Sequence, residues 1–313
     1  MKKALPMNPV RLALLAGALI VACSSTQNSS RAPNADRTFM FAPRVDMKFR
    51  HEMKNLDEVV VAGSNFRDSV ESRVLWEVAV TQEGDTKYFY HRRLLELGLK
   101  VNGADVLAGP EIASQRAEIV QMMSRDGHVI DITGTERVTQ ALKTVVPPAE
   151  RARVAEVFSP ENLRAMLMAR AVDVFDEVVG KPTDHGSTWS SKNGNGPLRG
   201  KQVLVDSSVG CGPKTCRKLK RTYDVDPEKV GDFARRRVAA FLAESGFDPA
   251  SVRMVDAKLK VEDTFVVEPD TCHFHDATLA QEGKVVLEGP KGNRFEVVFI
   301  NKQTSHAEYP PPA

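Results

Sequence analysis

The feature that most limits the fold of this chain is a two-residue alternation of apolar and polar side chains. It is clearest in "RVDMKFRHEM", where one side of the alternation carries Val45, Met47, Phe49 and His51 and the other carries charged residues. Because successive side chains of a strand point to opposite faces, this pattern predicts a strand with one buried face. Such strands are typical of an antiparallel sheet with a core on one side.

Turn residues between β-rich runs predict hairpins in the first half of the chain. Glu83-Gly84-Asp85 separates two such runs, Asn102 opens another turn, and Asp126-Gly127 lies between two further alternating runs. We therefore expect an antiparallel meander in this half.

The second half repeats this organisation after a segment rich in Gly, Ser, Asn and Pro. "KQVLVDSS" predicts its first strand, and four later runs predict strands joined by turns at Pro269-Asp270, Glu282-Gly283 and Lys291-Gly292-Asn293. No short-period repeat relates these segments.

Amphipathic helices are expected between the two sets of strands and within the second set. "TERVTQALKTVV" is one, and "SPENLRAMLMARAVDVFDEVVG" is another, with Ser159 at the N-cap, Pro160 at N1 and Gly180 as its end. "DVDPEKVGDFARRRVAAFLAESG" is a third, with Asp226 at the N-cap and a partly solvated face at Arg235 to Arg237. The predicted fold class is α+β: antiparallel curved β-sheets, built as meanders, packed with a few amphipathic helices in two halves.

The N-terminal residues have the form of a secretory signal. Lys2, Lys3 and Arg11 precede or flank an apolar run of about eleven residues, against the roughly 20 that a spanning helix needs. The run ends in Ile20, Val21, Ala22 and Cys23, which resemble the lipobox of bacterial lipoproteins. This resemblance implies cleavage before Cys23, acylation of its thiol and a membrane anchor made of acyl chains. The alternative is an ordinary signal peptide that leaves Cys23 as a free or paired thiol.

Ser24 follows the lipobox-like residues, and this resembles the lipoproteins that are sorted to the outer membrane. The polar stretch that comes next cannot bury enough apolar surface to fold by itself and predicts a tether. The expected organisation is a signal peptide at 1–22, a flexible tether at 23–42, a β-rich domain with a helical insert at 43–190, a linker at 191–199, an α+β domain at 200–308 and a Pro-rich tail at 309–313.

Net charge argues against a nucleic-acid partner. The 43 basic and 41 acidic residues give a formal charge of +2, and removal of the predicted signal, with its three basic residues, leaves 40 basic against 41 acidic. No basic patch is evident in the sequence, so no nucleic-acid binding is expected.

With Cys23 assigned to lipid, three cysteines remain. "GCGPKTC" predicts a Gly-Pro turn closed by a disulfide between Cys211 and Cys216, which an oxidising envelope permits. The alternatives are the longer pairs Cys216–Cys272 and Cys211–Cys272. The same stretch lacks the glycine and the spacing of a phosphate-binding loop around Lys214.

The stretch "TCHFHD" contains the candidate metal ligands. On a strand, His273 and His275 would point to one face, and imidazole suits zinc or copper. No third ligand is evident, so the favoured interpretation is two solvent-facing histidines, with no metal and no other cofactor. No nucleophile elbow or paired carboxylates are evident, and the chain is expected not to be an enzyme.

Two further resemblances guide the functional hypothesis. From Arg44 to Trp189 the chain resembles a β-rich domain of unknown function found in bacterial lipoproteins, through "SRDGHVIDITG", the helical block after it and "VVGKPTDHGSTW". Strands curving around helices are also distantly similar to the half-barrel carrier and lipid-binding lipoproteins of the envelope. That resemblance implies a curved sheet that holds acyl chains in an apolar cavity.

The sequence thus predicts a non-enzymatic lipoprotein of the bacterial cell envelope, held at the outer membrane by acylated Cys23 and facing the periplasm. Its curved sheet is expected to bind an apolar or lipid ligand or an envelope protein. A structural or assembly lipoprotein without a ligand is the alternative, and a metal-binding enzyme using His273 and His275 is less favoured.

Overall fold

A computed structural model describes residues 38–107, 117–146, 148, 151, 158–171, 177–192, 198–212 and 214–310 of the chain. The predicted signal peptide and the predicted lipidation site Cys23 lie outside the described residues, as do residues 311–313. Among the helices in the described ranges, none combines the length and the apolar character needed to cross a membrane.

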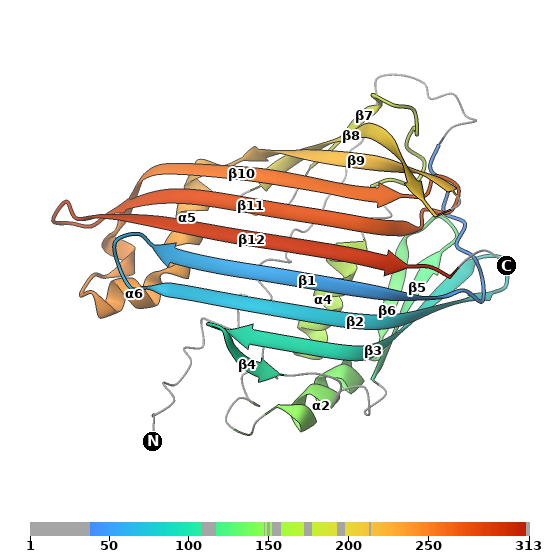
Figure 1. The fold of residues 1–313 in the computed structure, drawn as a ribbon, viewed down its shortest axis with the longest axis horizontal. Helices are drawn as coiled ribbons and strands as arrows, with labels where there is room; N and C mark the ends of the chain where they lie inside the picture. Colours follow the sequence, from blue (N-terminus) through green and yellow to red (C-terminus); the bar gives the residue numbers. More distant parts are fainter. Residues whose placement is uncertain are drawn as a thin grey trace.

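The strands form one antiparallel sheet, which confirms the expected α+β class (Figure 1). Its order is β6-β5-β3-β2-β1-β12-β11-β10-β9-β8-β7, and β4 pairs with β3 outside this path. The strands are β1 (Lys48–Val61), β2 (Arg67–Glu83), β3 (Lys87–Val101), β4 (Ala104–Leu107), β5 (Glu118–Ser124), β6 (Val129–Thr133), β7 (Thr188–Lys192), β8 (Leu198–Cys211), β9 (Lys214–Val225), β10 (Arg253–Val267), β11 (Phe274–Glu288) and β12 (Arg294–Glu308).

The pairing of β1 with β12 joins the two halves of the chain in the middle of the sheet. It runs without a register shift from Arg50 opposite Glu308 to Val61 opposite Val297. The strands of ranges 43–190 and 200–308 therefore share one sheet. The predicted linker at 191–199 lies partly in strands, because β7 pairs with β8 on either side of it.

Alternation along each strand separates an inner from an outer face. On β1 the inner residues His51, Asp57 and Val59 are buried, while Lys48 and Arg50 on the outer face are exposed. The period-two pattern thus predicted the strands and the face on which the core lies.

The helices in the described ranges are α2 (Thr135–Val145), α4 (Pro160–Ala171), α5 (Pro227–Arg237) and α6 (Ala239–Glu244), with a 3₁₀ turn η4 at Pro249–Ser251. In Figure 1, α4 lies behind the long central strands, α5 and α6 lie at their left end, and α2 lies below β3 and β4. Two of these helices, α4 and α5, begin where capping chemistry predicts. The Asp226 carboxylate accepts from the backbone N–H groups of Glu228 and Lys229, and Ser159 Oγ accepts from the N–H of Asn162 at 3.2 Å. Both predicted N-caps are therefore confirmed.

Two features of the predicted helices are wrong. Residues 177–180 form turns and are not the end of a helix that begins at Pro160, although Val178 is fully buried there. The last predicted helix is broken at Val238, which has the non-helical φ and ψ of −103° and 12°, into α5 and α6.

The predicted turn at Glu282-Gly283 is also wrong, because β11 runs through it without interruption. Gly283 lies on the inner face opposite Phe299, and a Cβ at this position would come within 1.9 Å of the Phe299 ring. The glycine therefore makes room for an aromatic side chain on the neighbouring strand, a role that glycine often has inside strands.

The partly solvated face expected at Arg235 to Arg237 is wrong for Arg237. Its guanidinium is buried and donates from Nη1 to Asp57 Oδ2 on the inner face of β1 at 2.6 Å. It also lies over the ring of Phe233, 5.6 Å from the centroid. This ion pair links the C-terminal end of α5 to β1 in the middle of the sheet.

Two apolar clusters pack on the inner face. They lie at opposite ends of β1, β10, β11 and β12, whereas on β2 and β3 the first cluster continues along the strands to Val70, Leu99 and Val101. The first contains residues of α2 and α4 together with Phe39 and Phe41, which end the predicted tether and are buried. The second lies under α5 and α6 and includes Val59 and Phe299. A row of inner positions between the clusters carries mostly polar side chains: Arg221, Asp263, Leu279, Gln303 and Asn55.

Candidate functional site

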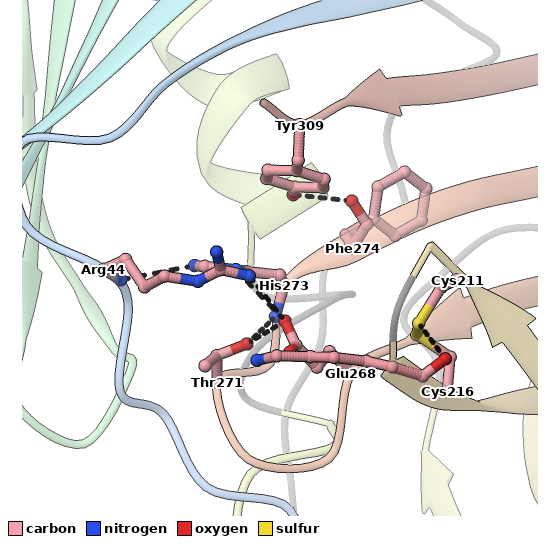
Figure 2. Close-up of a disulfide and its surroundings, with 9 residues drawn as sticks. Arg44, Cys211, Cys216, Glu268, Thr271, His273, Phe274 and Tyr309 are labelled. Atoms are coloured by element: carbon pink, nitrogen blue, oxygen red, sulfur yellow. Dashed lines mark hydrogen bonds and ion pairs between the residues drawn. A yellow bond between two sulfur atoms is a disulfide. The ribbon is translucent and has the colours of Figure 1, made fainter. Parts of the chain in front are cut away.

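The hairpin between β8 and β9 carries the predicted cysteine pair. Cys211 and Cys216 form a disulfide with their Cα atoms 5.8 Å apart, and Gly212 in the turn has a positive φ of 65° (Figure 2). The structure therefore places the local pair together and leaves Cys272 as a buried free thiol. Burial raises the pKa of Cys272 to about 12, so this thiol stays protonated and unreactive at neutral pH.

The two candidate histidines do not lie as the sequence suggested. His273 precedes β11, in the turn after β10, and is buried, so its interpretation as a solvent-facing side chain is wrong. His275 is half-buried on β11. Both rings contact Tyr309, with centroids 5.1 Å and 4.8 Å from the tyrosine ring respectively.

The geometry offers a different set of potential metal ligands from the predicted pair. A ring nitrogen of His275 and the sulfur atoms of Cys211 and Cys216 lie within 4.8 Å of one another. A metal would need both sulfurs as thiolates. Because they are bonded to each other in the structure, this group does not offer a metal site in its disulfide form.

A buried carboxylate, Glu268, gathers the polar side chains around this hairpin. Its Oε2 accepts a hydrogen bond from Thr271 Oγ1 at 2.7 Å and lies 3.7 Å from Arg44 Nη2, while its Oε1 pairs closely with Lys214 Nζ. Figure 2 shows these groups meeting beside the disulfide. Glu268 thus connects the segment before β1, the β8–β9 turn and the β10–β11 turn.

His273 stands beside this carboxylate as a neutral ring. The backbone N–H of Arg44 donates to Nε2 at 3.4 Å, and Nδ1 lies 3.3 Å from Glu268 Oε2. Burial, together with the nearby charges of Arg44 and Lys214, lowers the pKa of His273 to about 3. This neutral ring packs between Glu268 and Tyr309.

Tyr309 separates this carboxylate cluster from a second polar group. Its hydroxyl donates to the carbonyl of Phe274 at 2.7 Å, and its ring packs on Phe49 with centroids 4.7 Å apart. Burial raises the pKa of Tyr309, so the phenol remains neutral. The first residue of the predicted Pro-rich tail is therefore part of the core.

The second polar group surrounds Arg92, which sequence reasoning missed. Arg92 lies on the inner face of β3 and donates from Nε to Gln121 Oε1 at 3.2 Å. Its Nη1 lies 3.4 Å from His51 Nδ1, and the other ring nitrogen of His51 lies 2.6 Å from Ser305 Oγ. The guanidinium also lies 6.0 Å from the centroid of the Tyr90 ring.

Arg92 is surrounded by protein and still partly exposed. Burial lowers its pKa, and the same cause raises the pKa of Tyr90. The signal for this group was available in "YFYHRRLLEL", because the strand alternation that places Tyr90 and Leu94 on the inner face also places Arg92 there. A cation at an inner position of a strand is a reason to look for a site.

Beyond this group, part of the inner face lies between the two apolar clusters. Val261 and Leu279 project from it, are partly exposed and belong to neither cluster. Met53 lies two strands away from Leu279, on β1, where it packs against the first cluster and is also partly exposed. Amide side chains share this region: Asn55, Gln281 and Gln303 are partly exposed, and Asn301 bonds to Asn55 and Gln303. We call this surface, from Met53 to Val261 across β1, β12, β11 and β10, the inner gap.

Comparisons with known proteins give distant likenesses. No family model and no curated protein sequence matches the chain. A solved structure of lipovitellin, described under the heading of lipid–protein interactions, is similar to 86% of this chain with a TM-score of 0.43 and 11% sequence identity. The chain spans only 26% of the length of the lipovitellin chain.

Two further solved structures are similar at lower scores. An outer-membrane channel from Pseudomonas putida F1 has a TM-score of 0.20 and 8% identity, over 89% of this chain and 100% of the channel. A DUF1329 family protein from Desulfovibrio piger has a TM-score of 0.12 and 8% identity, over 97% and 93% of the two chains. At TM-scores below 0.5 these likenesses carry no functional conclusion for this chain.

Proposed function

We propose that this chain is a lipid-anchored envelope protein whose curved sheet binds an amphipathic lipid on its inner face. The observation that carries the proposal is the inner gap, where Val261 and Leu279 keep exposed apolar surface between two separately packed clusters. Apolar side chains on a concave face with a few polar groups are typical of ligand sites. The amides of Asn55, Gln281 and Gln303 favour a ligand that has polar atoms as well as an acyl chain.

The proposed ligand is tested by placing a charge in the inner gap. In Leu279→Glu a carboxylate would lie where an acyl chain binds, and we expect the affinity for a fluorescent long-chain fatty acid to fall at least about ten-fold, which corresponds to about 1.4 kcal/mol. The matched control is Val286→Glu, on the outer face of the same strand, which should leave the affinity unchanged. Equal effects of the two variants, or no binding by the wild-type protein, would contradict the proposal.

The proposed anchor rests on the lipobox-like residues that end in Cys23. In cells expressing the full chain, Cys23→Ala should abolish acylation and move the protein from the membrane to the soluble fraction, because the two or three acyl chains that stabilise membrane attachment would be missing. Mass spectrometry of the N-terminal peptide measures the acyl groups. Cys272→Ala is the control, since this buried thiol has no role in anchoring. Membrane attachment of the Cys23→Ala protein would show that the anchor lies elsewhere.

A further inference from the structure

Arg92, which is partly exposed on the inner face, differs from the buried cations that the structure describes. Lys201 pairs with Glu177 at 2.5 Å, Arg221 lies 3.2 Å from Asp263, and Arg237 lies 2.6 Å from its own carboxylate partner. In the described ranges, no carboxylate contacts Arg92, whose polar partners are an amide oxygen and an imidazole nitrogen. Burying a guanidinium without a counter-charge costs free energy, so its place in the interior calls for an explanation.

Among the described residues, the side chains that contact Arg92 supply hydrogen-bond acceptors and no negative charge. An arginine has no acceptor of its own, so the contact with His51 requires that Nδ1 accept, and His51 is then neutral with its proton on Nε2, facing Ser305. Tyr90 beside it is a neutral phenol. The group therefore carries one net positive charge on the inner face of the sheet.

The cation is connected to the inner gap through β1 and β12. His51, which contacts Arg92, and Met53 are successive inner residues of β1, and Ser305 lies directly opposite Met53 on β12. Inner residues of one strand are about 7 Å apart, so His51 and Asn55 are about 14 Å apart, a distance that an extended long acyl chain can span. Arg92 also keeps exposed surface, so a ligand can reach it.

We propose that Arg92 binds the oxyanion of an acyl lipid, a carboxylate or a phosphate, whose chain lies over Met53 and along the inner gap. This inference rests on the proposed lipid-binding function and specifies its ligand as anionic. The planar guanidinium matches the two oxygens of such a group, and the Gln121 amide and the His51 ring hold it in place. The lipid would provide the negative charge that this part of the protein lacks.

The test compares ligands that differ only in the headgroup, using the full-length protein. A long-chain fatty acid, the alkyl phosphate and the alcohol of the same chain length compete with a fluorescent lipid probe. For the wild-type protein we expect the acid or the phosphate to bind at least about ten-fold more tightly than the alcohol. The preference between acid and phosphate identifies the oxyanion.

Arg92→Met removes the charge and keeps a side chain of similar length. We expect this variant to lose the preference for the anionic lipid while binding the alcohol within about two-fold of the wild-type affinity, a difference of less than 0.5 kcal/mol. Arg93→Met is the matched control: Arg93 is exposed on the opposite face of β3, pairs with Glu77, and should leave the preference intact. A urea titration checks that both variants fold, and Arg92→Lys, which keeps a charge, supplies a second variant.

The outcomes separate this inference from the function on which it rests. Equal affinities of the acid and the alcohol for the wild-type protein, or an unchanged preference in Arg92→Met, would overturn the role of Arg92 and leave lipid binding standing. Acetate or inorganic phosphate displacing the probe as well as the lipids would show a small-anion site instead. If none of the lipids binds, the proposed function itself fails.

Discussion

Replacing Asp57 with alanine is expected to lower the free energy of unfolding by about 3–5 kcal/mol, measured by urea denaturation. The substitution leaves the buried guanidinium of Arg237 without its carboxylate, 2.6 Å away in the native protein. The cost of an uncompensated charge in this position exceeds what the pair itself contributes. Loss of the pair also loosens α5, so its amide protons should exchange faster.

The double variant Asp57→Ala/Arg237→Met distinguishes this mechanism from simple loss of packing. Because the second substitution removes the unpaired charge, we expect it to recover much of the lost stability. Glu296→Ala is the control for a surface ion pair: it breaks an exposed contact with Lys284 and should cost at most about 1 kcal/mol. A similar cost for Asp57→Ala and Glu296→Ala would contradict the assignment of Arg237 as a buried charge.

The second large effect is expected at Glu268, where alanine should lower the free energy of unfolding by about 3 kcal/mol. This loss of stability lies at the lower end of the range expected for breaking a buried ion pair. The reason is that the side chains of Arg44 and Lys214 are each 37% exposed and can turn to water. Thr271 is buried and cannot, and it would lose the acceptor that holds it in the turn before β11.

Glu268→Gln refines this prediction, since it keeps an acceptor for Thr271 and removes the charge. We expect it to lose less stability than the alanine variant. Glu282→Ala, on the exposed outer face of β11, is the control and should change stability by less than about 0.5 kcal/mol. If Glu268→Ala behaved like this control in denaturant titrations, the carboxylate would have no part in joining the three segments.

The strands and their faces could be predicted from the sequence because they depend on local alternation. The N-caps at Ser159 and Asp226 could be predicted for the same reason. The prediction of a turn at Gly283 was wrong because this position needs a glycine for another reason: the ring of Phe299 on the next strand leaves no room for a Cβ atom. Sequence spacing does not report such a contact.

The candidate site was harder to predict, because it depends on pairs far apart in the chain. Arg237 is charged and was expected to be solvated, yet its partner on β1 lies 180 residues away. His273 is buried by Tyr309 and Glu268, which the strand pattern around "HFH" could not show. The alternation of "YFYHRRLLEL" places Arg92 on the inner face, but it does not give the partners of Arg92 on β1 and β5.

The central pairing of β1 with β12 also determines when the molecule can fold. The two strands come from opposite ends of the described chain, so β1 and β11 both remain open edges until β12 arrives. The meander of β1, β2 and β3 can form early from local contacts. The pairing of β1 with β12 forms last, because these two strands are separated by most of the chain. Completion of the fold therefore waits for the end of the chain to be made, and until then a holding chaperone would find two unpaired strand edges to protect.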